Sequence, residues 1–401
     1  MAKIDKDLRL LFVQEAERPL TRRMFLRRAG AAGLLVAGSG WLAACGGGGG
    51  DTTSTSTGGS STTGGAGPTT TAAGPTTTRA LDKQLNFYNW SDYIAEDTIP
   101  NFEKEFGVKV TYDNYSSNDT LLAKLQSGAS GYDIIVPSDY MVTTMLGLGL
   151  LQQIDLANIP NVKNLYPRFR EEPFDPGNKY SIPWQWGTTG IGYNTEKVPD
   201  FKPSWDMMWD AKYKGHITML TEIRDIFAVA LFRMGEDINT TDPAKIDKAK
   251  QMLIEQKSLL KHYTSDTYID ELASNDSWLS HGYSGDVFQA IGENDKVAYA
   301  IPDEGAVIWV DSMCVPKDAP HKYTAEVFMD YILRPDVGAA ISNYVSYASP
   351  NQAAESLVSQ EIRNDPGIYP SAEVSQRLQY IKELGDATQL YNAAYEEVKA
   401  A

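Results

Sequence analysis

Apolar and polar residues follow two regular spacings from about residue 82 onward, one typical of strands and one typical of helices. Compact apolar runs such as QLNFYNW and YDIIVPS predict strands, while EDTIPNFEKEFG and SNDTLLAKLQSG carry apolar residues at helical spacing. In chain order, we expect a strand at 84–90, a helix at 96–107, a strand at 108–115, a helix at 117–128, a strand at 132–138 and a helix at 139–151. Gly107 should end the first helix, and Asn118 or Asp119 should lie near the cap of the second. Strands that alternate with helices predict parallel βαβ units and an α/β fold.

Two long apolar runs interrupt this alternation in the second half of the chain. YSIPWQWGTTGIGYN, at 180–194, carries three glycines and predicts a strand that crosses from one lobe to another. EGAVIWVDSMCVP, at 304–316, has the same character and would carry the chain back. Two crossings between two α/β lobes predict a clamp with hinges near residues 187–190 and 306–309.

Aromatic and acidic residues stand side by side where two of the predicted strands end, in NWSDY at 89–93 and in VPSDY at 136–140. Ligands of open α/β sheets bind beyond the carboxyl ends of the strands. A single Trp is more often a core residue, and a single acid is more often a solvated surface charge. Trp309-Val310-Asp311 repeats the pairing of an aromatic residue with an acid, which adds to the case for a ligand site at these strand ends.

The composition narrows the class of ligand. The chain has 401 residues, which leaves room for two or three domains, and 42% of them are hydrophobic, as in ordinary soluble proteins. The formal net charge of −16 argues against a nucleic-acid partner and suits a cationic ligand. A generic acidic, exported protein is the alternative that charge alone leaves open.

The N-terminus predicts export rather than a folded domain. TRRMFLRR precedes an apolar run of 16 residues, which is short for a membrane span of about 20. TRRMFLRR resembles a twin-arginine export signal, and LAAC at 42–45 resembles a lipobox, whose cysteine is lipidated and becomes the new N-terminus. We therefore expect a signal peptide at 1–44, with a permanent N-terminal anchor helix as the alternative.

A linker and two cysteines complete this prediction. Residues 45–81 comprise the lipidated Cys45 and a segment rich in Gly, Ser and Thr, which is too polar to form a packed core. Such a tether of about 35 residues would span roughly 30 Å on average. Cys314 is the second cysteine, and we expect it to be a small buried residue without a disulfide partner.

Most of the chain, from Leu85 to about Ala400, resembles the periplasmic spermidine/putrescine-binding proteins of ABC importers. The resemblance is carried by YNWSDYIAEDTIPNFEKEFGVKVTYD, SGYDIIVPSDY, IPWQWGTTGIGYN, HGYSGDVFQA, EGAVIWVDSMCVP and NDPGIYPSAEV. It implies a two-lobed periplasmic-binding-protein fold, in which each lobe is a mostly parallel sheet flanked by helices. The expected division is 82–188 plus 309–355 for the first lobe and 189–308 plus 356–401 for the second.

The resemblance also implies a set of residues that hold a polyamine in the cleft. Carried over residue by residue, the resemblance implies that Trp90 and Tyr93 flank the ligand and that Ser91 and Asp92 contact one amine end. It implies that Ser138 and Tyr140 line the first lobe and that Glu222 and Asp225 are carboxylates of the second. Tyr283 and Asp286 would face the ligand, and the box would be completed by Trp309, Asp311 and Tyr347. Tyr283 stands where relatives often have tryptophan, and a glutamine that spermidine binders use near the C-terminus has no clear counterpart. The choice between putrescine and spermidine therefore stays open.

Elementary chemistry agrees with this implied ligand. A polyamine is an alkyl chain with protonated amines at fixed spacing, so its methylenes favour apolar faces and its charges favour carboxylates. An ammonium over an indole contributes roughly 0.5–2 kcal/mol. Charge-assisted hydrogen bonds to carboxylates are about twice as strong as neutral ones.

The motifs of common enzyme classes are missing from the sequence, which has no G-x-S-x-G, no H-E-x-x-H and no P-loop. The four histidines are scattered, so we expect no metal, no cofactor and no enzymatic activity. We expect a monomer outside the cytoplasm, in the periplasm or on the outer face of the cell membrane, whose partners are a polyamine, an ABC permease and the membrane. A binding protein for another solute such as a sugar, or a hydrolase that uses Asp286 and Asp311, remains an alternative.

Overall fold

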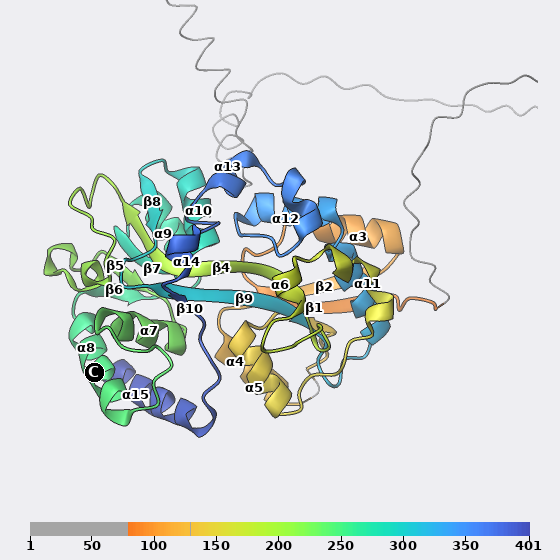
Figure 1. The fold of residues 1–401 in the computed structure, drawn as a ribbon, viewed down its shortest axis with the longest axis horizontal. Coiled ribbons are helices and arrows are strands. Elements are labelled where there is room, and N and C mark those ends of the chain that lie inside the picture. The colour runs from red at the N-terminus through yellow and green to blue at the C-terminus, as the bar shows by residue number, and fades with distance from the viewer. Residues whose placement is uncertain (1–78, 129) are drawn as a thin grey trace, which may run out of the picture. The chain divides into compact units, whose positions relative to one another are not determined.

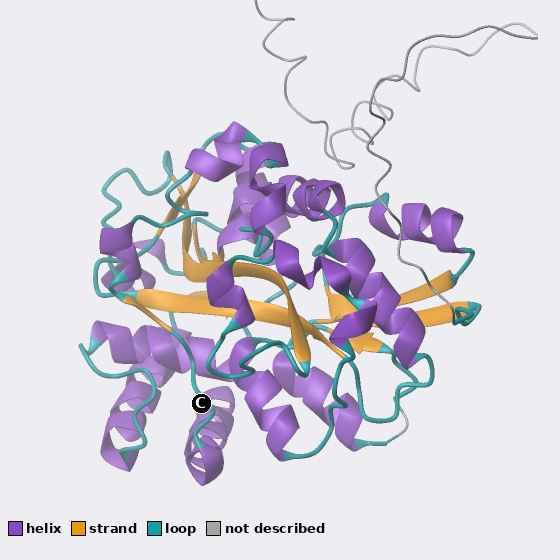
Figure 2. Cartoon of the chain, turned by 45° about the vertical axis from the view of Figure 1, so that its right-hand side comes forward, coloured by secondary structure: helices purple, strands orange, loops and turns teal. Residues whose placement is uncertain are grey.

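The computed structural model describes residues 79–128 and 130–401, so the predicted signal peptide, Cys45 and almost all of the predicted linker lie outside the described residues. The described chain forms one sheet of ten strands with helices on both faces (Figures 1 and 2). The strands are β1 (Gln84–Trp90), β2 (Lys109–Tyr115), β3 (Ile134–Ile135), β4 (Ser181–Asn194), β5 (Ile217–Met219), β6 (Leu260–Tyr263), β7 (Leu279–Tyr283), β8 (Val297–Ala300), β9 (Ala306–Cys314) and β10 (Leu378–Gln379). Within the described residues, no helix is both long and apolar enough to cross a membrane.

The sheet consists of two parallel parts that two long antiparallel strands connect. The strand order is β2-β1-β3-β9-β4-β7-β5-β6, with β10 beside β9 and β8 beside β4. β1 is parallel to β2 and β3, and β5 is parallel to β6 and β7. β4 and β9 pair in antiparallel fashion from Ser181 opposite Cys314 to Thr189 opposite Val307, and every residue of β9 is buried. These two strands are the predicted crossings.

Helices flank each part of the sheet. We call the part with β1–β3 the first lobe and the part with β5–β8 the second lobe; β4 and β9 run through both (Figure 1). The helices of the first lobe are α3 (Thr98–Phe106), α4 (Asn118–Gln126), α5 (Asp139–Gly147), α6 (Pro167–Arg170), α11 (Lys322–Ile332) and α12 (Pro335–Val345). Those of the second lobe are α7 (Ile223–Arg233), α8 (Pro243–Lys257), α9 (Tyr268–Ser274), α10 (Ser284–Glu293) and α15 (Thr388–Ala400), which packs on α8. The short helices α13 (Gln360–Asn364) and α14 (Ala372–Ser375) lie between α12 and β10 in the chain.

The helix ends follow local chemistry closely. α3 ends at Gly107, whose φ of 66° is a left-handed conformation that suits glycine, as predicted. α4 begins at Asn118, which therefore lies next to the cap as predicted; the N-cap itself is Ser117, whose hydroxyl accepts a hydrogen bond from the Thr120 N–H at 3.1 Å. β3 is only two residues long, since Pro137 follows its short apolar run and Ser138 caps α5.

The main core extends through both lobes, and one part of it lies where β1, β4 and the first-lobe helices meet. The Phe87 ring packs edge-on against Trp184 and Phe328, with centroids 5.7 and 5.2 Å away. Gly187 and Gly190 have no room for a methyl group, since a Cβ would come within 2.9 Å of the Trp309 ring at Gly187 and within 2.5 Å of the Ala300 carbonyl oxygen at Gly190. Cys314 is fully buried at the end of β9, which confirms the prediction of a small buried residue.

Candidate ligand-binding site

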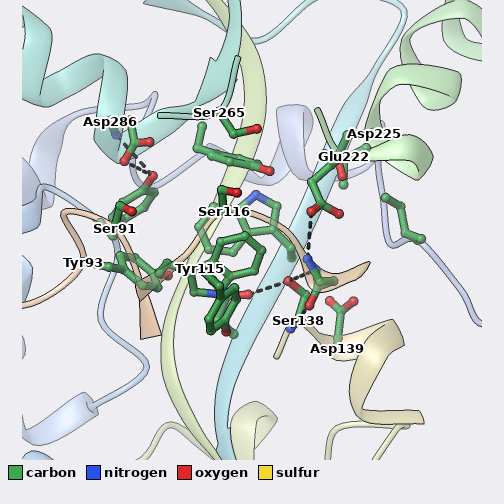
Figure 3. A pocket seen from close by; sticks show the side chains of 18 of the residues that line it. Ser91, Tyr93, Tyr115, Ser116, Ser138, Asp139, Glu222, Asp225, Ser265 and Asp286 are labelled. Carbon is green, nitrogen blue, oxygen red and sulfur yellow. Dashed lines mark hydrogen bonds between the residues drawn. The ribbon is translucent and has the colours of Figure 1, made fainter. Parts of the chain in front are cut away.

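A pocket of about 660 Å³, which includes space open to solvent, lies at the ends of strands from both lobes (Figure 3). Every residue of the predicted ligand set except Asp92 lines it. The first lobe contributes residues from the end of β1 and the start of α5, and the second contributes residues from the starts of α7 and α10. The sequence stretches that carry aromatic and acidic residues therefore converge on one place in the fold.

Trp90 and Tyr115 form an aromatic wall at the ends of β1 and β2. Their rings are 4.7 Å apart and tilted by 51°. The indole Nε1–H of Trp90 and the hydroxyl of Tyr115 both donate to the carbonyl oxygen of Val136, at 2.8 and 2.6 Å. Because both polar groups are satisfied by the same backbone acceptor, the ring faces are fixed in orientation and remain available to an apolar ligand.

A second aromatic cluster surrounds Tyr347. The Tyr347 ring lies edge-on to Tyr93 at 5.0 Å and contacts Trp309 at 5.4 Å, and Trp309 in turn lies edge-on to Tyr283 at 5.8 Å. Trp309 donates its Nε1–H to the Thr189 hydroxyl on the neighbouring strand at 3.2 Å. Trp309 and Asp311 are two positions apart on β9, so their side chains project to the same face of the sheet.

Asp286 lies at one side of the pocket, in the first turn of α10 (Figure 3). Its carboxylate accepts hydrogen bonds from the hydroxyls of Tyr347, at 2.6 Å, and Tyr268, at 2.7 Å. Burial raises the pKa of Asp286 to about 7, against the effect of these two hydrogen bonds. The carboxyl group is thus held in place while its charge lacks a cationic partner.

Asp311 projects from the middle of β9 and accepts a hydrogen bond of 2.7 Å from the Ser138 hydroxyl. The side chain is 5% exposed, and burial raises its pKa to about 7, with smaller contributions from the charges of Asp225 and Asp286. The Tyr93 phenol is buried nearby, and its pKa is raised by burial and by the charge of Asp311. A cation in the pocket would lower the cost of ionising Asp311.

Further carboxylates lie at the opposite side, at the start of α7 (Figure 3). Asp225 accepts from the Thr189 hydroxyl at 3.0 Å, and burial raises its pKa to about 6. Glu222 is 1% exposed, and burial together with the charges of Asp225 and Asp119 raises its pKa well above the ordinary value. Both side chains lie at the N-terminus of α7, whose partial positive charge favours the ionised form and would lower their pKa. Burial has the larger effect, so the pKa of each is raised.

Among residues 79–128 and 130–401, no Lys, Arg or His lines the pocket. Arg224 lies between Glu222 and Asp225 in the sequence, but its guanidinium donates to the Lys382 carbonyl at 2.9 Å and lies over the Tyr391 ring. Within the same described ranges, no three His, Cys, Asp or Glu side chains are placed to hold one metal ion. Among the described residues the pocket therefore gathers several buried carboxyl groups and no basic side chain that could pair with them.

Asp92 is the predicted residue that does not line the pocket. It lies in the exposed turn after β1 with a φ of 50°, which is a left-handed conformation that Asp tolerates better than most residues. Its charge still contributes to raising the pKa of Asp286, after burial, so the two carboxylates are within electrostatic reach. Its predicted contact with an amine remains a prediction.

Several lining residues were not predicted from the sequence. They are Tyr115, Ser116, Asn118, Asp139, Ser265, Asp266, Val307 and Ile381. Tyr115 ends β2, Asp139 follows Ser138 in the VPSDY stretch, and Ser265 with Asp266 follows β6, so the strand-end rule could have found these four. Asp139 is also a buried carboxylate whose pKa is raised well above normal by burial, and it accepts from the Val310 N–H at 3.1 Å.

The comparisons with known proteins identify the class. Residues 98–370 match the family model described as bacterial extracellular solute-binding protein. A solved structure from Listeria monocytogenes, described as a spermidine/putrescine ABC transporter, superposes with a TM-score of 0.77 at 34% identity and covers 79% of this chain and 99% of its own. The predicted two-lobed periplasmic-binding-protein fold is confirmed, and the chain belongs to the bacterial extracellular solute-binding proteins.

Two curated relatives have names that specify a ligand. The putrescine-binding periplasmic protein PotF of Escherichia coli is 40% identical over 326 residues, which are 76% of this chain and 87% of that protein. The putrescine-binding periplasmic protein SpuD of Pseudomonas aeruginosa is 38% identical over 327 residues, covering 77% of this chain and 89% of that protein. The similarity thus extends over nearly the whole described chain.

Proposed function

We propose that this protein binds a polyamine, putrescine or spermidine, outside the cytoplasm and delivers it to an ABC importer. The observation that carries the proposal is the group of five buried carboxylates in an aromatic pocket that no basic side chain of the described ranges lines. Burying several carboxylates together without a cation is unfavourable, and a polycation removes that cost. The names of the relatives, which specify putrescine or spermidine, support the same ligand class.

The arrangement of the acids fits a linear ligand with a charge at each end. Asp286 lies at one side of the pocket, while Glu222 and Asp225 lie at the other, with aromatic rings between them (Figure 3). The methylenes would lie along Trp90 and Trp309, and one ammonium would face Asp286 and Asp311. The other ammonium would face Asp225. A sugar would leave these buried charges uncompensated, which is the reason to prefer a polyamine.

We propose binding without chemical turnover. Both oxygens of Asp286 already accept hydrogen bonds from tyrosine hydroxyls, which does not suit a catalytic acid or base, and the chain belongs to a family of solute-binding proteins. A thermal-shift panel with putrescine, spermidine, spermine, sugars and amino acids tests the proposal. Polyamines should raise the melting temperature in proportion to ln[ligand], and the ligand should be recovered unchanged. A shift with a sugar alone, or conversion of the ligand, would contradict it.

The N-terminal predictions complete the proposed function. We propose cleavage after residue 44, lipidation of Cys45, export by the twin-arginine route and a linker to residue 81. The protein would then act as a lipid-anchored monomer beside its permease. We also propose that the chain passes between the lobes at 188/189, 308/309 and 355/356, with hinges in β4 and β9. The last boundary assigns residues 356–401 to the second lobe, and the packing of α15 on α8 supports it.

A further inference from the structure

Glu222 makes hydrogen bonds to the opposite lobe with both of its carboxylate oxygens. It is the residue immediately before α7 in the second lobe, and it is 1% exposed. Its Oε1 accepts from the backbone N–H of Asn118, the first residue of α4 in the first lobe, at 2.9 Å. Its Oε2 accepts from the hydroxyl of Tyr140 on α5, also in the first lobe, at 3.3 Å.

This contact uses a strong local preference for negative charge. The first N–H groups of a helix have no partner within the helix, and the N-terminus carries a partial positive charge. The N–H of Asn118 is one of these groups in α4, and Glu222 also lies at the N-terminus of its own helix α7. One carboxylate therefore joins the N-termini of two helices that belong to different lobes (Figure 1).

Asn118 also connects this contact to the ligand pocket. Its side-chain Nδ2 donates to the Ser138 hydroxyl at 3.1 Å, and its Oδ1 accepts from the Ser138 N–H at 3.2 Å. The Ser138 hydroxyl in turn donates to Asp311 Oδ1 at 2.7 Å. A continuous chain of hydrogen bonds thus runs from the pocket carboxylate Asp311, through Ser138 and Asn118, to Glu222 of the other lobe.

We propose that Glu222 is an interlobe latch, and that it holds the two lobes closed through the Asn118 N–H instead of binding the ligand directly. The inference rests on the proposed function for its ligand, and it reassigns a residue that the family resemblance placed among the ligand contacts. Asp225, one turn further along α7, then supplies the ammonium contact at this side of the pocket. Ligand release requires the latch to open, so the latch sets the residence time.

Proline at position 118 provides a selective test. Asn118→Pro removes the N–H that Glu222 accepts, and the first position of a helix tolerates proline. Ser117 before it is already extended, with φ −154° and ψ 151°, as a residue before proline must be. Asn118→Ala removes the same side chain but keeps the N–H, so the difference between the two variants isolates the donor.

The measurement is the rate of putrescine release, followed by the fluorescence of the pocket tryptophans. Asn118→Pro should release putrescine about 10- to 100-fold faster than Asn118→Ala, the range expected for one hydrogen bond to a charged group. Glu222→Gln should also accelerate release in the parent but add less in the Asn118→Pro background, because only the longer bond to the Tyr140 hydroxyl is left there for Glu222 to lose. Equal acceleration by Glu222→Gln in both backgrounds would show that Glu222 acts on the ligand directly and would overturn the latch.

A ligand-free measurement separates failure of the latch from failure of the proposed function. Spin labels at cysteines replacing the exposed Ala123 on α4 and Glu255 on α8 report the distance between the lobes. A Cys45→Ala background leaves only the buried Cys314 as a native thiol. Asn118→Pro should lengthen the distances relative to Asn118→Ala even if no polyamine binds the parent. Identical distributions in the two variants would overturn the latch.

Discussion

The hydroxyl of Tyr347, just after α12, donates a hydrogen bond of 2.6 Å to Asp286 Oδ1 at the start of α10. The same hydroxyl accepts a hydrogen bond from the Asp286 N–H at 3.2 Å, so Tyr347 binds both the backbone and the carboxylate of Asp286. The Tyr347 ring also covers Gly285, where a Cβ would clash with the ring. The pocket acid is therefore oriented before any ligand arrives, which lowers the cost of ordering it on binding.

Removal of this hydroxyl should weaken binding without unfolding the protein. Tyr347→Phe leaves the ring contacts but deprives Asp286 of a donor, so its carboxylate becomes more costly to ionise. We expect polyamine affinity to fall about 10-fold, the value of one hydrogen bond to a charged group, as measured by calorimetric titration. Tyr166→Phe is the matched control, since the Tyr166 hydroxyl bonds to exposed Glu355 outside the pocket. Equal affinities in both variants would contradict this role of Tyr347.

Trp90 should contribute through its ring face. Trp90→Ala removes apolar area and the cation–π contact, so we expect a loss of about 2 kcal/mol, or roughly 30-fold in affinity. Trp90→Phe should lose less, because a smaller ring face remains. Trp278→Ala is the control, since Trp278 stacks on His216 at 3.6 Å and does not line the pocket. Titration in which Trp90→Ala and Trp278→Ala behave alike would argue against the stacking.

The empty protein should lose stability as the pH rises from 5 to 8. Asp286 and Asp311 have pKa values of about 7 in the folded protein, raised from an ordinary 3.8 by burial. Between these values the folded state binds more protons than the unfolded state, so each group lowers the free energy of unfolding by up to about 1.4 kcal/mol per pH unit. Polyamine binding keeps both groups ionised and removes this penalty, so the ligand-induced rise in melting temperature should grow over the same interval.

Thermal denaturation of the parent and of the Asp286→Asn/Asp311→Asn variant, with and without putrescine, measures this dependence. The variant should be less sensitive to pH between 5 and 8, because asparagine does not titrate. A ligand-induced shift in the parent that is constant from pH 5 to pH 8 would mean that these carboxyl groups are already ionised in the empty pocket.

Anchoring should depend on one of the two cysteines. Cys45→Ala should move the protein from the membrane fraction to the soluble fraction and leave polyamine binding intact, since the pocket lies wholly within the residues after 79. Cys314→Ala is the matched control and should stay with the membrane. Mass spectrometry of the native N-terminus should find a lipidated Cys45; a protein that still begins at Met1 would contradict the predicted processing.

The parts of the fold that follow from local sequence could be predicted well. The predicted crossings at 180–194 and 304–316 correspond to β4 and β9, because a continuous apolar run in a buried strand leaves few alternatives. The strand predicted at 132–138 is reduced to Ile134–Ile135, because Pro137 and the cap residue Ser138 turn the chain into α5.

The site could be predicted only where a residue has distinctive chemistry. Aromatic and acidic residues at strand ends, such as Trp90 and Asp311, point to a ligand from the sequence itself. Val307 and Ile381 have no such signature, and only the tertiary arrangement brings them to the pocket. The two bonds of Glu222 to the other lobe were likewise beyond prediction, because they join residues 104 and 82 positions apart.

Calorimetric titration of the parent and of Asp311→Asn with putrescine and spermidine tests the central claim most directly. The variant keeps the shape of the side chain but removes a buried charge, which leaves an ammonium unpaired in the pocket. We expect it to lose roughly 2–5 kcal/mol of binding, or about 30- to several-thousand-fold in affinity, while its melting temperature without ligand does not fall. If Asp311→Asn binds both polyamines as tightly as the parent, or if the folded parent binds neither, these carboxylates do not form a polyamine site.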